Sequence, residues 1–127
     1  MEKHTILIPI NITDEDITDI MEMAYIGSNY WLGDIKVARR GKALKDDTYV
    51  EVLLNKGKLS ISAPEDDANN TYHDYPLTLS SLLKGIGIYL KKYGDCIEEG
   101  GINSGKLDVS DCDLILQYAL FEEQVYG

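Results

Sequence analysis

The chain has 127 residues, the size of one domain, and we expect a single domain over residues 1–127. A hydrophobic fraction of 44% with 27% charged residues is typical of a folded protein and excludes a disordered one. Twelve Lys and Arg against 22 Asp and Glu give a formal charge of −10. This charge argues against direct nucleic-acid binding, because the phosphate backbone is negative too.

The first 27 residues predict a strand and then a helix. Isoleucines at positions 6, 8, 10 and 12 alternate as in a half-buried strand over residues 4–12. Pro9 cannot donate a backbone hydrogen bond, so this strand is expected at a sheet edge. Residues 13–27 change to the spacing of an amphipathic helix. Thr13 followed by Asp16 marks its start, and Gly27 its end.

The middle of the chain predicts three strands and a loop. The strands are expected over residues 34–40, 48–54 and 58–62, and "NKG" at 55–57 is typical of a hairpin between the last two. The stretch "APEDDANNTYHDYP", residues 63–76, is rich in Pro, Asp and Asn and predicts an exposed loop.

The last third predicts two more helices, over residues 78–94 and 108–120, with Thr78 and Asp108 as their N-caps. A loop is expected at 98–106, and the tail "EQVYG" can add a short strand. The mixed order of elements predicts an α+β fold in which a small antiparallel sheet of about four strands packs with three helices.

No pattern of catalytic or metal-binding residues is found in the sequence. His4 and His73 lie far apart, and Cys96 and Cys112 have no second thiol or histidine at metal-ligand spacing. The serines show no nucleophile-elbow motif. We therefore expect no enzyme, no catalytic residue, no metal and no cofactor. No run reaches the ~18 apolar residues of a membrane helix, and no signal peptide is recognised, so a cytoplasmic protein without a membrane partner is expected.

The segment "NYWLGD" is followed by a basic stretch, and together they predict a ligand site. Five basic residues lie within residues 36–45 of an otherwise acidic chain. Aromatic side chains beside basic ones can stack a base and neutralise its phosphates. We expect Trp31 or Tyr30 to stack the base, Asn29 to hydrogen-bond it, Arg39 and Arg40 to meet phosphate, and Gln117 and Tyr118 to contribute more weakly. The alternative is a solvated strand and half-buried tyrosines around a small core.

Two longer segments resemble a known family. The sequences "ITDEDITDIMEMAYIGSNYWLGDIKV" (12–37) and "DLILQYALFEEQVYG" (113–127), with residues 76–90 between them, resemble small, mostly uncharacterised proteins of phages and prophages of low-GC Gram-positive bacteria. That family has a "YWC" triplet and a "QYALFG…VFG" tail. Leu32 replaces the cysteine, so no thiol chemistry is carried over, and Glu122 stands where the family has a glycine.

The resemblance implies a phage accessory protein that counters bacterial defence. One expectation is a non-enzymatic homo-oligomer that binds and sequesters a nucleotide-derived immune signal, as counter-defence sponges do. A pocket at a subunit seam would suit that role. The alternative is an acidic inhibitor, similar to an anti-CRISPR protein, that mimics nucleic acid and binds a defence effector protein. The acidity is also consistent with a simple role in solubility.

Overall fold

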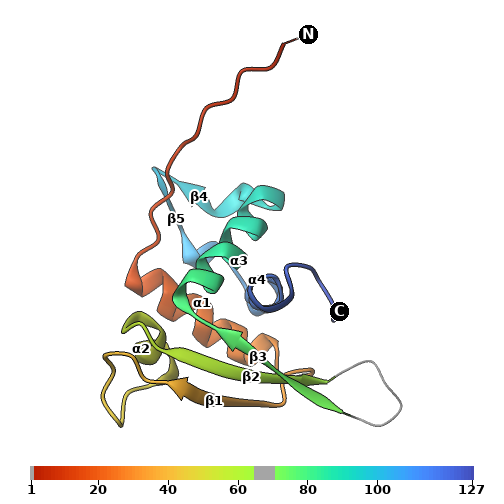
Figure 1. Cartoon of the computed structure of the whole chain (residues 1–127). Coiled ribbons are helices and arrows are strands. Elements are labelled where there is room, and N and C mark those ends of the chain that lie inside the picture. Colours follow the sequence, from red (N-terminus) through yellow and green to blue (C-terminus); the bar gives the residue numbers. More distant parts are fainter. Residues whose placement is uncertain (1, 65–70) are drawn as a thin grey trace.

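The computed structural model describes residues 2–64 and 71–127, and within them the fold is α+β, as predicted (Figure 1). Strands β1–β3 form an antiparallel sheet in the order β1-β2-β3, and β4 and β5 form a separate hairpin. The helices are α1 (Asp14–Gly27), α2 (Tyr49–Leu54), α3 (Leu79–Lys92) and α4 (Val109–Phe121). The strands are β1 (Asp34–Arg39), β2 (Lys58–Pro64), β3 (Tyr72–Leu77), β4 (Ile97–Glu98) and β5 (Gly101–Ile102), and short 3-10 turns cover Gly94–Cys96 and Ser104–Lys106.

Each of the helices α1 to α4 begins with a capping box. The side chains of Thr13, Thr48, Thr78 and Asp108 each accept a hydrogen bond from the backbone amide three residues later. The side chain of that later residue bonds back to the cap in every case. Two otherwise unpaired backbone donors are satisfied at each start, which fixes where each helix begins.

The core lies between the sheet and the helices. Leu59, Ile61 and Ala63 alternate along β2 and are fully buried, so one face of the sheet is covered. Helix α4 packs against both α1 and α3, and it also contacts β3. The apolar stripe of α1 is buried at Ile17, Ile20, Met21 and Ala24, whereas Tyr25 lies on the surface. Figure 1 shows α1, α3 and α4 on the same side of this sheet.

Several predictions for individual elements are wrong. The expected loop at 98–106 contains strand β5 and a 3-10 turn. Residues 48–54 form a helix, α2, instead of a strand, so "NKG" follows a helix and β2 pairs with β1. Residues 72–77, predicted as part of a loop, form strand β3. Residues 65–70 of the same predicted loop lie outside the described residues. The tail forms no strand and is held by side-chain hydrogen bonds.

The predicted strand at residues 4–12 does not form within the chain. Residues 2–10 have no regular secondary structure and extend away from the body in Figure 1. The backbone bridge to the body is at Asn11, which forms a parallel bridge with Gly101. Ile6, Leu7 and Ile8 are 76%, 94% and 70% exposed. The alternation is therefore present in the sequence, but the described part of the chain supplies no neighbouring strand.

Helices α3 and α4 approach so closely at Gly85 that a side chain has no room. A Cβ atom at Gly85 would lie 2.6 Å from the backbone nitrogen of Ala119 and 2.7 Å from the carbonyl oxygen of Ile115. At Gly87, two residues further along α3, a Cβ atom would meet nothing within 4 Å. The close packing of α3 on α4 thus requires a glycine at position 85 but not at position 87.

We expect Gly85→Ala to destabilise the protein by about 1–3 kcal/mol, because the two helix backbones must separate. Gly87→Ala is the matched control on the same helix, and we expect it to be neutral or to stabilise by up to ~1 kcal/mol. Urea unfolding of dilute protein measures both changes. Equal effects of the two substitutions would contradict the close approach at Gly85.

Candidate functional site

The turn after α1 places Trp31 in the core. Its side chain is only 4% exposed. The indole stacks on the ring of Tyr126, with centroids 5.0 Å apart and planes 6° from parallel, and Phe121 lies 5.8 Å away. A residue of the tail thus covers the face of the indole that a ligand base would need. The expectation that Trp31 stacks a ligand is not compatible with this burial.

Asp113 of α4 is the acceptor around which this turn is organised. Its carboxylate is 7% exposed. Oδ1 accepts hydrogen bonds from Ser28 Oγ at 2.8 Å and from Trp31 Nε1 at 2.7 Å, and Oδ2 accepts one from the Tyr30 hydroxyl at 2.7 Å. Gln117 Nε2 donates to Oδ1 at 3.2 Å. Four donors therefore satisfy one buried carboxylate, which compensates for its loss of water.

Gln117, one helical turn after Asp113, holds the tail of the chain. It is 1% exposed. Its Oε1 accepts from the backbone nitrogens of Val125 and Tyr126, both at 2.8 Å, and its Nε2 also donates to the Tyr126 carbonyl at 3.1 Å. We call Asp113, Gln117 and the groups that they bind the Asp113 network. The network fastens the turn and the tail to α4, which is a structural role.

The structure separates the residues that the sequence placed in one site. Trp31, Gln117 and Tyr118 are buried, whereas Asn29 and Tyr30 are exposed. Arg39 and Arg40 lie at and beyond the far end of β1, about 15–20 Å along the strand from the turn. The seven predicted residues therefore do not converge on one ligand. The Asp113 network brings together Tyr30, Trp31 and Gln117. Arg39 and Arg40 lie outside this network.

A polar hollow of about 790 Å³ lies beside Tyr30. Its walls include Tyr89 and Tyr93 together with the carboxylates of Asp111 and Asp113, and no Lys or Arg is among its lining residues. A phosphate group would meet negative charge there without a cation to offset it. This hollow is therefore unsuited to the phosphate-bearing ligand that the sequence suggested.

Tyr30 should give a distinct signal in a pH titration. Burial of its hydroxyl, followed by the hydrogen bond to Asp113 and the charge of that carboxylate, raises the pKa of Tyr30 to about 12. The folded state thus favours the neutral phenol. Its contribution to stability is complete below the ordinary tyrosine value of about 10 and is lost as the pH rises through about 12. We expect phenolate absorbance to show a late-titrating tyrosine that is missing in Tyr30→Phe. An unchanged titration curve in that variant would contradict this assignment.

A second hollow, of about 730 Å³, lies over β1, the loop at 40–48 and the start of α2. We call it the basic hollow. Three cationic residues, Lys36, Arg40 and Lys45, and one acidic residue, Asp47, are among its lining. Such an excess of cations is notable in a chain with a formal charge of −10. An anion is attracted here and repelled by most of the remaining surface.

Hydrogen bonds within the loop hold the shape of the basic hollow. Arg40 Nη1 donates to the carbonyls of Leu44 and Lys45 at 3.2 and 2.9 Å. The carboxylate of Asp47 accepts from the backbone nitrogen of Leu44 at 2.6 Å. Arg40 thus positions the loop with one side of its guanidinium, and Asp47 is engaged by backbone. A preformed loop loses less conformational entropy when a ligand binds.

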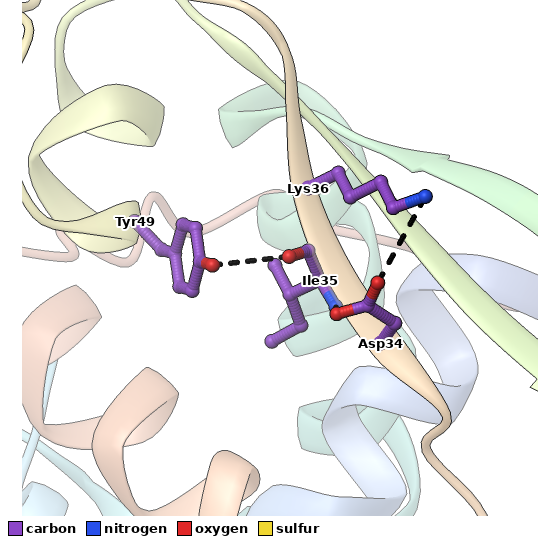
Figure 2. Close-up of polar contacts among 4 residues, drawn as sticks. All are labelled: Asp34, Ile35, Lys36 and Tyr49. Atoms are coloured by element: carbon purple, nitrogen blue, oxygen red, sulfur yellow. Dashed lines mark hydrogen bonds and ion pairs between the residues drawn. The ribbon is translucent and has the colours of Figure 1, made fainter.

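Tyr49, the first residue of α2, joins the basic hollow to an apolar one. Its hydroxyl donates to the carbonyl oxygen of Ile35 at 3.0 Å, as Figure 2 shows. In the same view the Lys36 side chain runs toward Asp34, with Nζ 3.9 Å from Oδ2. Both partners of that ion pair are largely exposed, so it is weak and leaves the ammonium available.

The apolar hollow measures about 740 Å³ and lies between α1 and α2. Met21, Tyr25, Ile26 and Leu54 are among its apolar lining residues, and Glu22 and Glu51 line it as well. Ile35, Thr48 and Tyr49 line both hollows. Sequence reasoning identified the basic stretch but missed Tyr49, because residues 48–54 were expected to form a strand. The capping-box pattern "TYVE" was the signal for a helix start at this point.

Other chemistry is not indicated by the described residues. Between residues 2 and 64 and between 71 and 127, no group of three or more His, Cys, Asp or Glu side chains is placed to hold a metal ion. In the same ranges no helix has the length and apolar character needed to span a bilayer. Cys96 and Cys112 are free and buried, and burial raises the pKa of Cys112 to about 12.

Neither a family model, nor a curated protein, nor a solved structure matches this chain. The resemblance to phage proteins accordingly stays a prediction from the sequence.

Proposed function

We propose that the protein binds and sequesters a small nucleotide-derived signal, without altering it, at the two hollows that meet at Tyr49. The base would lie in the apolar hollow against Tyr25 and Tyr49, and its phosphates would meet Lys45 and Lys36. The observation that carries this proposal is the adjoining of an aromatic, apolar hollow to one with three cations. A nucleotide has a flat base, which suits the apolar hollow, and anionic phosphates, which suit the basic hollow.

This proposal keeps the expected class of ligand and changes the site. Tyr49 takes the stacking role that was expected of Trp31, and the basic stretch keeps its role toward phosphate. Together with the resemblance to phage proteins, such binding would counter a bacterial defence from within the host cytoplasm. No arrangement for catalysis supports the site, so we propose storage of the ligand instead of turnover.

A direct test mixes the protein with a panel of cyclic nucleotides and ADP-ribose-type nucleotides and measures binding by calorimetry. The protein is then denatured by heat, and the released nucleotide is identified by chromatography. We expect one class of nucleotide to bind and to be recovered intact. A chemically changed product would contradict sequestration, and a lack of binding across the panel would contradict the proposed function.

Single substitutions then locate the site. We expect Lys45→Glu to weaken binding at least tenfold, since the loss of one charge-assisted contact costs about 1.5–3 kcal/mol. Tyr49→Ala should weaken binding to a similar degree, because base stacking contributes about 1–3 kcal/mol. Lys84→Glu is the matched control, because Lys84 is exposed on α3 and pairs with Glu122. Equal losses in Lys45→Glu and Lys84→Glu would contradict this location.

A further inference from the structure

We infer that residues 3–10, here called the arm, pack on a second copy of this chain and make the protein a dimer. The arm has the alternating pattern of a half-buried strand, yet Ile6 and Ile8 lie largely in solvent and only Ile10 is partly buried. Among the described residues, no backbone hydrogen bond is found for residues 3–10. Unpaired extended backbone with apolar side chains is the form in which chains add strands to one another.

Most of the arm extends away from the rest of its own chain, and only Ile8 and Ile10 line a hollow together with α3. The backbone nitrogen of Asn11 donates to the carbonyl of Gly100 at 2.7 Å, and Asn11 is bridged to Gly101. These contacts anchor the base of the arm at the β4–β5 hairpin, and beyond them the arm leaves the body (Figure 1). An arm anchored in this way reaches another molecule more readily than its own sheet.

The same chain also carries a surface that such an arm fits. A hollow of about 460 Å³ lies between the base of the arm and α3, and we call it the arm hollow. Ile8, Ile10 and Ile12 form one wall, and Leu83, Gly87 and Leu90 contribute to the other. Nothing lies within 4 Å of the position that a Cβ of Gly87 would take. The helix backbone is therefore open to an approaching strand.

The charge distribution around the arm and the arm hollow favours the binding of a second copy there. Residues 3–12 include Lys3 and His4 and no Asp or Glu. Lys91 is the one charged residue among those that line the arm hollow. Two chains of formal charge −10 repel each other over most of their surfaces, and this apolar, acid-free region lets them meet without that cost.

A two-fold arrangement satisfies both surfaces at once. Each chain contributes one arm and one arm hollow, so a reciprocal contact leaves neither unpaired. The arms would lie antiparallel above the two α3 helices, with the exposed Ile6 and Ile8 side chains of each copy covered by the other copy. Pro9, which has no N–H, would face outward from the pair. This inference does not depend on the proposed ligand.

The test measures the mass of the protein in solution over a range of concentrations, by light scattering and sedimentation. We expect a dimer for the unmodified chain. We also expect its dissociation constant to rise by at least ~100-fold in the double variant Ile6→Asp/Ile8→Asp, because two apolar side chains lose their burial and two charges take their place. Thr5→Asp is the control, because it adds a charge to the same arm on the other face.

Gly87→Trp tests the receiving surface separately from the arm. The indole would fill the arm hollow of each copy, and we expect it to raise the dissociation constant while leaving the circular dichroism of the chain unchanged. Hydrogen exchange supplies a local measurement: amides of residues 4–8 should be protected in the dimer and exposed after dilution.

Three outcomes would overturn the inference. The first is a monomer at every concentration whose arm exchanges freely, which would leave the hollow to a different protein. The second is a monomer in which the arm is protected, which would mean that the arm folds onto its own chain. The third is a dimer that survives both the arm variant and Gly87→Trp.

Discussion

Replacing Asp113 by alanine should destabilise the protein by about 3–5 kcal/mol, a large part of the 5–15 kcal/mol that holds a typical domain together. The substitution removes the acceptor for Ser28, Tyr30 and Trp31 at once. Each buried donor that loses its partner costs about 1–3 kcal/mol, and the partly exposed Tyr30 can turn to water and recover some of its share. Urea unfolding, followed by the fluorescence of the single tryptophan, measures the loss.

Two further variants show whether the network is the cause. Asp113→Asn keeps one carbonyl oxygen for Ser28 and Trp31, so we expect it to recover part of the stability. Asp46→Ala is the control. Asp46 is exposed, and its substitution removes the same charge without affecting the Asp113 network. A change of less than about 1 kcal/mol in Asp113→Ala would contradict the role of this carboxylate as a shared acceptor.

Trp31→Ala should cost about 3–5 kcal/mol and release the tail from the body. The loss of a fully packed tryptophan leaves a large cavity. The ring contacts to Tyr126 and Phe121 are lost with it. Because Tyr126 also donates a hydrogen bond from its hydroxyl to the carbonyl of Pro64, loosening of the tail should extend to the end of β2. Chemical denaturation and proteolysis of residues 122–127 measure the two effects.

Trp31→Phe separates packing from ligand binding. It keeps an aromatic ring against Tyr126 and removes the donor to Asp113 Oδ1 together with a smaller part of the packed volume than Trp31→Ala does. We expect this variant to remain folded and to bind nucleotide as well as the unmodified protein does. A folded Trp31→Phe variant that has lost binding would restore Trp31 to the ligand site and contradict the placement at Tyr49.

Local signals in the sequence account for the elements that were predicted correctly. Helices α1, α3 and α4 combine a capping residue with an apolar stripe of helical period, and both signals lie within the helix itself. Helix α2 has the same cap, Thr48 with Glu51. Its six residues are too few to show a helical period, and Val50 and Val52 gave the alternation of a strand.

Long-range contacts account for most of what was missed. The burial of Trp31 depends on Asp113 and Tyr126, which lie 82 and 95 positions later in the chain. Nothing near Trp31 distinguishes an indole stacked on a tail from one offered to a ligand. Strand β3 buries only Leu77 completely, so its composition resembles that of a loop, and its pairing with β2 decides its structure.

The hydroxyl of Tyr49 has a consequence for the solubility of the protein. Strand β1 is at the edge of its sheet, where free backbone groups can template pairing with other chains. The phenol occupies one of these acceptors, the carbonyl of Ile35. Tyr49, which we propose to contact the ligand, therefore also blocks one backbone acceptor through which an edge strand could pair with another chain. A Tyr49 variant that loses binding exposes that acceptor as well, so its self-association has to be measured before the loss of binding is attributed to the missing ring.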